Sequence, residues 1–424
     1  MCAWTFSTNP SSVSPSTFVP QGQWTTFTEA SSIVGQVEHY SPQVVSTRTF
    51  TPGAATRARQ RLRSIEMSGT ALKAPADGFT SSFSDTRFDA VLVVSFGGPE
   101  GMDDVIPFLE NVTRGRNVPR ERLEEVAHHY ELFGGVSPIN AQNRALIAAL
   151  RKELDAHGID LPIYFGNRNW DPFLADAMQE MADAGVERAL SFFTSAYSSY
   201  SGCRQYRENL YEAQQTVGPR APEVVRTRMF FNHPGWIETN ADHVRTALAQ
   251  IPHGREAHVA FTAHSIPLAM AQACRYEDQL RESVRLVAET VGATDTKLVY
   301  QSRSGPPHIP WLEPDILDHL RTLAERGVTD VVVSPIGFVS DHLEVLFDLD
   351  IEARDTAAEL GLNLVRASSA GTHPAFISMI RELIEERLGL RAGRTSVGRF
   401  AASHDVCPVD CCLPGTGCAS PWAG

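Results

Sequence analysis

From Phe88 onward, short apolar runs rich in β-branched and aromatic residues alternate with longer stretches of helical period. The apolar runs are 89–95, 162–166, 188–194, 224–231, 258–263, 297–301, 330–336 and 362–367. Clear helical periods between them include 144–154 and 279–291. Strands that alternate with helices in this way form parallel sheets with helices on both faces. The sequence therefore predicts an α/β protein.

The two halves of this region are similar to each other. The segment DAVLVVSFGGP (89–99) aligns with AHVAFTAHSIP (257–267), since each is a strand that ends in small residues and a proline. FGNR (165–168) and YQSR (300–303) follow at a similar spacing. We expect two similar Rossmann-like domains with the active cleft between them, because parallel sheets bind ligands beyond the carboxyl ends of their strands. A single large doubly wound domain is the alternative.

The expected boundaries divide the chain into four parts. These are an N-terminal extension (1–85), a first domain (86–250), a second domain (251–398) and a cysteine-rich tail (399–424). The extension is rich in Ser, Thr and Pro and shows no lasting apolar period, so it is predicted to be disordered. The same composition suits an organelle transit peptide, or sequence upstream of a true start at Met67.

Net charge and hydropathy exclude several classes of binding partner. The formal net charge of −13 argues against nucleic acid and anionic lipid. No apolar run approaches the roughly 18 residues that a membrane-spanning helix needs. We expect a cytoplasmic protein without a transmembrane segment, present as a monomer or weak dimer. Organelle targeting by residues 1–85 is the alternative.

A histidine ends one of the predicted strands. His264 lies in FTAHSIP (261–267), and its counterpart in the first half is Phe96, so the fold itself does not require a histidine there. A neutral imidazole at a strand end can accept a proton or coordinate a transition metal. A hydrogen-bonded structural histidine is the alternative interpretation.

An acidic series occupies the segment 340–353. Asp341, Glu344, Asp348 and Glu352 follow one another at spacings of three and four. If the segment is one α-helix capped near Asp341, the four carboxylates form a stripe along one face. Neighbouring carboxylates repel each other, and a bound cation would offset that cost. A solvated helix face is the alternative.

Insertion of a metal into a porphyrin would use both features. The macrocycle must lose its pyrrole N–H protons while it gains a divalent cation, so its enzyme needs a base and a route for the metal. His264 is the candidate base, and Glu344 begins the candidate metal route.

Five segments together resemble the ferrochelatase family, from about residue 88 to the cysteine tail. They are VLVVSFGGPEG (91–101), FGGVSPIN (133–140), FTAHSIP (261–267), YQSRSGPPHIPWLEP (300–314) and SPIGFVSDHLEVLFDLDIE (334–352). Several motifs in one order make this resemblance more specific than any single motif. It implies an enzyme that inserts ferrous iron, its substrate, into a free-base porphyrin in haem biosynthesis.

The resemblance also assigns roles to individual residues. His264 and Glu344 would be the catalytic pair that holds the metal. Asp341, Asp348 and Glu352 would extend the metal site as an acidic relay. The residues that would contact the porphyrin are Ser137, Tyr206, Arg114, Tyr130 and Arg168.

Four cysteines crowd the C-terminus. Because no secretory signal is visible, Cys407, Cys411, Cys412 and Cys418 are typical of metal ligation rather than disulfides. A subset of ferrochelatases carries a [2Fe–2S] cluster on one internal and three C-terminal cysteines. The resemblance implies Cys203, Cys407 and Cys412 as ligands, with Cys418 or alternatively Cys411 as the fourth. Zinc is the other cofactor that such thiolates suit.

The stretch 111–133 stands where mitochondrial ferrochelatases have an apolar lip, and here it is strongly charged. This favours coproporphyrin III, which has more propionates, over protoporphyrin IX. The surroundings of Cys203 also resemble those in actinobacterial coproporphyrin III ferrochelatases. Phe96 replaces a tyrosine that some of these enzymes place beneath the metal, so axial contact from this position is not expected. A non-catalytic porphyrin or haem carrier, and a cobalt or nickel chelatase, are the alternative functions.

Overall fold

The structure is a computed structural model that describes residues 87–115, 118–305 and 307–415. These residues belong to one compact unit of the chain. The expected N-terminal extension (1–85) and Cys418 lie outside the described residues, so the predictions about them stay predictions.

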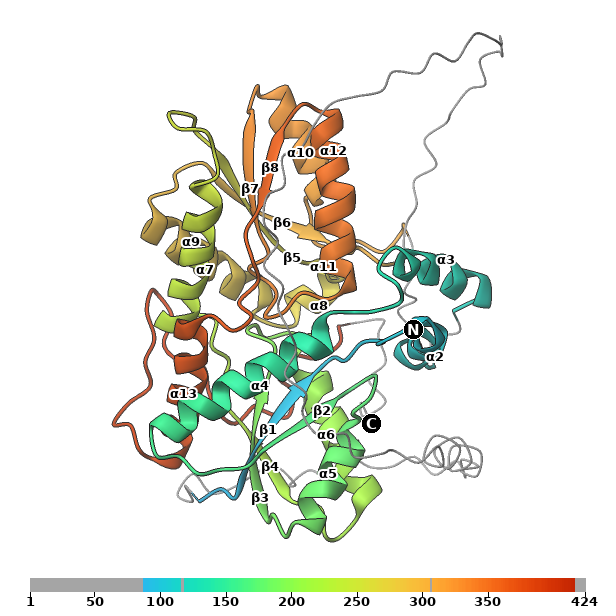
Figure 1. Ribbon diagram of the computed structural model, residues 1–424, viewed down its shortest axis with the longest axis vertical. Coiled ribbons are helices and arrows are strands. Elements are labelled where there is room, and N and C mark those ends of the chain that lie inside the picture. The colour runs from blue at the N-terminus through green and yellow to red at the C-terminus, as the bar shows by residue number, and fades with distance from the viewer. Residues whose placement is uncertain (1–86, 116–117, 306, 416–424) are drawn as a thin grey trace, which may run out of the picture. The chain divides into compact units, whose positions relative to one another are not determined.

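Two four-stranded parallel sheets form the framework of the described residues (Figure 1). The first has the strand order β2-β1-β3-β4 and the second has the order β6-β5-β7-β8. The strands are β1 (Ala90–Ser95), β2 (Ile163–Asn167), β3 (Arg188–Phe193), β4 (Glu223–Arg226), β5 (His258–His264), β6 (Thr296–Gln301), β7 (Asp330–Ser334) and β8 (Asn363–Arg366). Each predicted strand is present, and the identical order of the two sheets confirms the predicted similarity of the halves. One run is shorter than expected, because β4 ends at Arg226.

Helices connect the strands. Those up to the end of the first half are α2 (Met102–Val112), α3 (Arg120–Glu131), α4 (Ile139–Ala156), α5 (Leu174–Asp183), the π-helix η1 (Tyr200–Arg204), α6 (Gln205–Val217) and α7 (Pro234–Leu248). Those that follow are α8 (Leu268–Gln272), α9 (Tyr276–Val291), α10 (Ile316–Glu325), α11 (Leu343–Phe347), the π-helix η2 (Asp348–Ala353), α12 (Arg354–Glu359) and α13 (Pro374–Leu388). Within the described part of the chain, none is long and apolar enough to cross a membrane.

Alternating residues of the central strands explain why each sheet is covered on both faces. In β1, Leu92 and Val94 pack with α5 and α6, whereas Val91 packs with α4 on the other side. In β5, Ala260 packs with α10 and α12, whereas Phe261 packs with α7 and α9. Strands buried on both faces read as continuous apolar runs, which is why the sequence predicted them correctly.

The last helix of each half packs on the other half. Helix α7 lies against α9, β7 and β8, and α13 lies against α4 and β3 (Figure 1). One hydrophobic core therefore runs through both halves and includes Leu146 from α4 as well as Val287 from α9. This exchange connects the two sheets through packed side chains.

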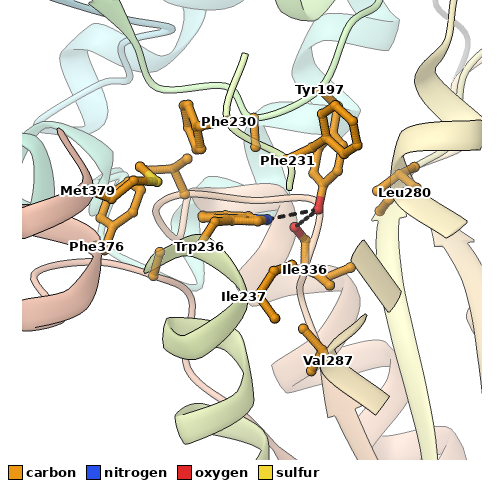
Figure 2. Packing of buried hydrophobic residues seen from close by; sticks show 14 of the residues in the cluster. Tyr197, Phe230, Phe231, Trp236, Ile237, Leu280, Val287, Ile336, Phe376 and Met379 are labelled. Atoms are coloured by element: carbon orange, nitrogen blue, oxygen red, sulfur yellow. Dashed lines mark hydrogen bonds between the residues drawn. The ribbon is translucent and has the colours of Figure 1, made fainter. Parts of the chain in front are cut away.

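A buried tyrosine adds a polar link inside that core. Tyr197, in the loop after β3, donates its hydroxyl to the carbonyl of Ile336 in the second half, at 3.1 Å. The indole Nε1–H of Trp236 on α7 donates to the same hydroxyl at 3.2 Å (Figure 2). The phenol thus satisfies two buried polar groups that would otherwise lack partners.

Candidate active site

His264 is the last residue of β5, at the edge where parallel sheets bind ligands. Its Nδ1–H donates to the carbonyl of Ser265, because a carbonyl can only accept. The remaining ring nitrogen, Nε2, lies 3.4 Å from Oε2 of Glu344 on α11. The two side chains are 20% and 34% exposed, so the pair is accessible from solvent while being partly desolvated.

The pair shifts the pKa values of both members. Burial by itself lowers the pKa of His264, but the hydrogen bond and charge of Glu344 outweigh it, so the pKa lies above its ordinary value. Burial tends to raise the pKa of Glu344, and the contact with His264 reverses this and lowers it. The pair without metal therefore favours an imidazolium beside a carboxylate.

The acidic segment is not the single α-helix that the sequence predicted. Helix α11 begins only at Leu343, with His342 as its N-cap residue, so Asp341 lies before the helix. From Asp348 onward the backbone forms the π-helix η2. The expectation of one α-helix capped near Asp341 is therefore wrong. π-Helical turns inside helices are frequent at functional sites, and local spacing rules for α-helices do not foresee them.

Three of the four acidic residues, Glu344, Asp348 and Glu352, nevertheless lie near one another in space. Asp348 interacts electrostatically with both Glu344 and Glu352. Glu344 and Asp348 are half-buried and Glu352 is exposed, so the series leads from the site toward solvent. Burial, reinforced by the two neighbouring carboxylates, raises the pKa of Asp348 to about 8.

Asp348 is held in place by the last residue of β6 and the residue after it. Its Oδ2 accepts a hydrogen bond from the hydroxyl of Ser302 and one from Nε2 of Gln301, the latter at 3.2 Å. Ser302 adopts a φ of 59°, in the left-handed region that non-glycine residues rarely occupy. Backbone strain of this kind is concentrated at functional sites.

The fourth acidic residue has a different partner. Asp341 forms two hydrogen bonds with the guanidinium of Arg366, the last residue of β8. Arg366 also contacts Asp350 through its Nε, at 2.6 Å. The charge of Asp341 is therefore compensated by an arginine, which stays protonated, whereas Glu344 pairs with a histidine that can release its proton.

In the first half, three of the residues singled out by the sequence lie together. The guanidinium of Arg168 stacks 4.6 Å from the ring centroid of Tyr206 and lies 5.7 Å from that of Phe96. Its Nε donates to Oδ1 of Asn209 on α6, at 2.7 Å. Phe96 follows β1 and is 36% exposed, whereas Tyr206 is buried beneath the arginine.

The remaining predicted porphyrin contacts lie on separate elements. Ser137 is buried against Gly98, where an added Cβ would lie only 2.7 Å from the serine Cβ. Tyr130 on α3 is buried near Glu344, and burial followed by that carboxylate raises its pKa. Arg114 is exposed and donates to Oδ1 of Asn111. The structure does not bring Arg114 into contact with the other predicted site residues that it describes.

Helices of the first half reach the element that carries Glu344. Phe108 of α2 and Tyr130 of α3 share a hydrophobic cluster with Leu343 of α11. The imidazole of His129 stacks on the ring of Phe347, with centroids 4.0 Å apart. The two halves therefore meet directly beside the His264–Glu344 pair.

A separate group of thiols lies where the tail returns to the first half. Cys203 of η1 contacts Cys407 and Cys412, and Cys411 in turn contacts both Cys407 and Cys412. The Sγ atoms of Cys411 and Cys412 are 3.4 Å apart. A ring nitrogen of His404 lies within 4.8 Å of the sulfurs of Cys407 and Cys411, a grouping that could hold a metal ion. Among the described residues, Cys411 completes the group of four thiols.

Comparison with known proteins identifies the family. The ferrochelatase family model matches residues 88–388, which is more than half of the chain. This chain belongs to the ferrochelatase family. It is 59% identical over 328 residues to a ferrochelatase from Rhodopirellula baltica. The aligned region covers 77% of this chain and 93% of that protein. It is 52% identical over 349 residues to the coproporphyrin III ferrochelatase of Streptomyces griseus (77% and 93% covered) and 53% identical over 344 residues to that of Nocardia farcinica (78% and 97%).

The ferrochelatase site contains residues that the sequence reasoning did not single out. His342 interacts electrostatically with both Glu344 and His264, and burial lowers its pKa. Its position two residues before Glu344 was a signal that could have been used. Gln301 and Arg366 had no comparable signal, because each reaches the acidic segment only through the pairing of strands.

Proposed function

We propose that this ferrochelatase inserts ferrous iron into coproporphyrin III. The observation that carries the proposal is the 3.4 Å contact between His264 and Glu344 at the carboxyl end of β5. It combines a proton acceptor and an anionic metal ligand in one site, as metallation of a free-base porphyrin requires. The names of the Streptomyces and Nocardia relatives favour coproporphyrin III as the macrocycle.

In this proposal His264 accepts the pyrrole protons and Glu344 receives the iron. Because the pair is charged before metal binds, the proton on His264 has to leave before the imidazole can act as a base. Asp348, whose pKa is raised to about 8, already holds a proton at neutral pH, so it relays a proton by passing its own toward Glu352 and solvent. Ferrous iron replaces two protons on the macrocycle, so the overall charge balances without electron transfer.

The first half would bind the porphyrin. Arg168 stacks on Tyr206 of α6, Ser137 lies against Gly98 after β1, and Tyr130 lies near Glu344. Arg114 is free of any described carboxylate contact and is exposed, which suits a propionate group. The surface of α2 and α3 supports the choice of a polar substrate, because Arg120 of α3 forms exposed ion pairs with Glu110 of α2 and with Glu124 of α3.

We also infer a [2Fe–2S] cluster on Cys203, Cys407, Cys411 and Cys412. The donor set fits, since four thiols gather beside the buried guanidinium of Arg226. When bound, the cluster could accept one electron, but the insertion of iron needs none, so we assign the cluster a structural or regulatory role. The chain's part is to bring the tail cysteines against Cys203 on η1. Anaerobically purified protein should contain equal amounts of iron and acid-labile sulfide, and zinc without iron would contradict the cluster.

The activity is tested by anaerobic incubation with ferrous iron and either coproporphyrin III or protoporphyrin IX, followed by the change in absorption bands. We expect a higher kcat/KM for coproporphyrin III. His264→Ala should still bind the porphyrin but lose metallation by at least about 100-fold, the usual contribution of a positioned acid–base group. Binding without turnover in the unmodified protein would instead indicate a porphyrin carrier.

A further inference from the structure

A buried arginine lies behind the thiol group. Arg226 is the last residue of β4, at the edge of the first sheet, and is only 7% exposed. Its Nη2–H donates to the sulfur of Cys407 at 2.9 Å and to the carbonyl of His404 at 3.4 Å. The guanidinium is therefore in direct contact with the segment that carries the tail cysteines.

The remaining contacts of Arg226 are weak or absent. Its Nη1 reaches the carbonyl of Thr227 at 3.4 Å, and its Nε is buried without a hydrogen-bond partner. Within the described ranges no carboxylate pairs with it, and its charged neighbours are Cys203, Cys407 and Cys411. Among the described residues, the anionic groups that act on this cation are therefore cysteine thiolates.

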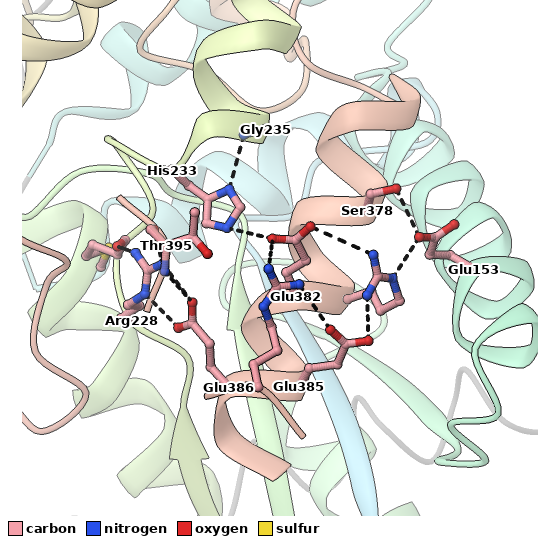
Figure 3. Close-up of polar contacts among 12 residues, drawn as sticks. Glu153, Arg228, His233, Gly235, Ser378, Glu382, Glu385, Glu386 and Thr395 are labelled. Atoms are coloured by element: carbon pink, nitrogen blue, oxygen red, sulfur yellow. Dashed lines mark hydrogen bonds and ion pairs between the residues drawn. The ribbon is translucent and has the colours of Figure 1, made fainter. Parts of the chain in front are cut away.

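Arg228, two residues further on, shows what this protein does with a buried arginine elsewhere. Its side chain is 0% exposed, and both its Nε and Nη2 bind the carboxylate of Glu386, at 2.7 and 2.9 Å (Figure 3). The carbonyl of Thr395 accepts a further hydrogen bond. Burying a guanidinium without an anion is costly, and Arg228 avoids this cost through a carboxylate.

We propose that Arg226 is the buried countercharge of the iron–sulfur cluster, a positioning residue that stabilises the cluster and favours its reduced form. This inference rests on the proposed cluster. Four thiolates and two sulfides leave the oxidised cluster negative, and one-electron reduction adds one more negative charge. A fixed cation hydrogen-bonded to a ligand sulfur stabilises the reduced state more than the oxidised one, because net charge and hydrogen bonds to sulfur set the reduction potential.

The test compares Arg226→Gln with Arg226→Lys in full-length protein that is purified anaerobically. The cluster's potential is measured by titration with dithionite, followed by absorbance and electron paramagnetic resonance. Arg226→Gln should shift the equilibrium between reduced and oxidised cluster at least tenfold toward the oxidised form. This corresponds to a reduction potential lower by about 59 mV for one electron. Arg226→Lys keeps the positive charge and should move it less.

Asn232→Ala is the matched control. Asn232 anchors the same tail by donating to the carbonyl of Phe400 at 2.7 Å, but it carries no charge. This variant loosens the tail and should leave the potential unchanged. A shift as large as that in Arg226→Gln would mean that tail contacts, not charge, set the potential, and would overturn the proposal.

Thermal unfolding covers the case in which Arg226→Gln retains too little cluster for a titration. Cluster binding should raise the Tm of the wild type more than the Tm of Arg226→Gln. The reason is that the negative cluster is attracted by the arginine's positive charge, which the variant lacks. If Arg226 were purely structural, Arg226→Gln would lower the Tm equally with and without the cluster, and that result would refute the proposal. Wild-type protein without iron and sulfide would refute the cluster itself. If the wild type carries the cluster but Arg226→Gln has the same reduction potential and the same gain in Tm, only the role of Arg226 is refuted.

Discussion

The guanidinium of Arg366 holds the carboxylate of Asp341 through two parallel hydrogen bonds, of 3.1 and 3.2 Å. Asp341 is close in sequence to Glu344 and was expected to extend the metal site as part of an acidic relay, yet only Glu344 faces His264. A bidentate arginine neutralises Asp341 and fixes its direction. Asp341 is therefore paired with a group that stays charged, whereas Glu344 faces a histidine that can lose its proton and leave the carboxylate to a cation.

This difference predicts unequal effects on turnover. Glu344→Gln should lower kcat/KM for ferrous iron by at least about 100-fold, because it removes an anionic group from the proposed metal site. Asp341→Asn should lower it by less than about tenfold, but should cost about 2 kcal/mol of folding free energy, because Arg366 loses a charged partner. Equal losses of turnover in the two variants would contradict the distinction.

The pKa of His264 should depend on Glu344. The carboxylate holds the pKa above the ordinary value of 6.5, so the imidazolium persists to higher pH. Glu344→Gln removes the negative charge, and burial then dominates and lowers the pKa of His264. NMR titration of histidine-labelled, metal-free protein would measure the shift, with His264→Gln to assign the signal. Asp341→Asn serves as the control and should leave that signal's titration nearly unchanged.

Asp348 should make the metal-free protein less stable as the pH rises. Its pKa is raised to about 8 in the folded state, whereas an unfolded aspartate titrates near 3.8. Between these values the folded state keeps a proton that the unfolded chain has lost, so the free energy of unfolding falls with pH, by up to about 1.4 kcal/mol per unit from this group. Urea denaturation across pH 5–8 should show that Asp348→Asn removes this part of the slope. An unchanged slope would mean that Asp348 ionises normally.

Tyr197→Phe should weaken the connection between the halves. The substitution leaves the carbonyl of Ile336 and the indole N–H of Trp236 buried without their partner, at a cost of about 1–3 kcal/mol. Denaturation followed by tryptophan fluorescence would measure it. Tyr164→Phe on β2 is the control, since the Tyr164 hydroxyl forms no hydrogen bond among the described residues. A comparable loss in the control would argue against the specific role of Tyr197.

Several features of the fold could be read from local patterns. The run DAVLVVS became β1 and HVAFTA became β5, because strands buried on both faces are continuous apolar runs. The π-helix η2 could not be read in this way, since the acidic residues keep a spacing that also fits an α-helix. Likewise, the length of β4 was overestimated, because Met229, Phe230 and Phe231 after it are apolar for reasons of core packing rather than strand pairing.

The sequence alone determined which residues can do chemistry here: an imidazole at a strand end, a series of carboxylates and a group of thiols. Local periodicity placed the imidazole correctly at a strand end, because burial and main-chain propensity act over a few residues, but it did not foresee the π-helix of the acidic series. Only the tertiary structure decided which of these groups meet. The strand order brings Arg366 into contact with Asp341 and Gln301 into contact with Asp348, and the C-terminal tail brings Cys407 into contact with Arg226. Such contacts join residues far apart in the chain, and electrostatic and hydrogen-bonding forces between them act only once the fold has brought them within a few ångströms.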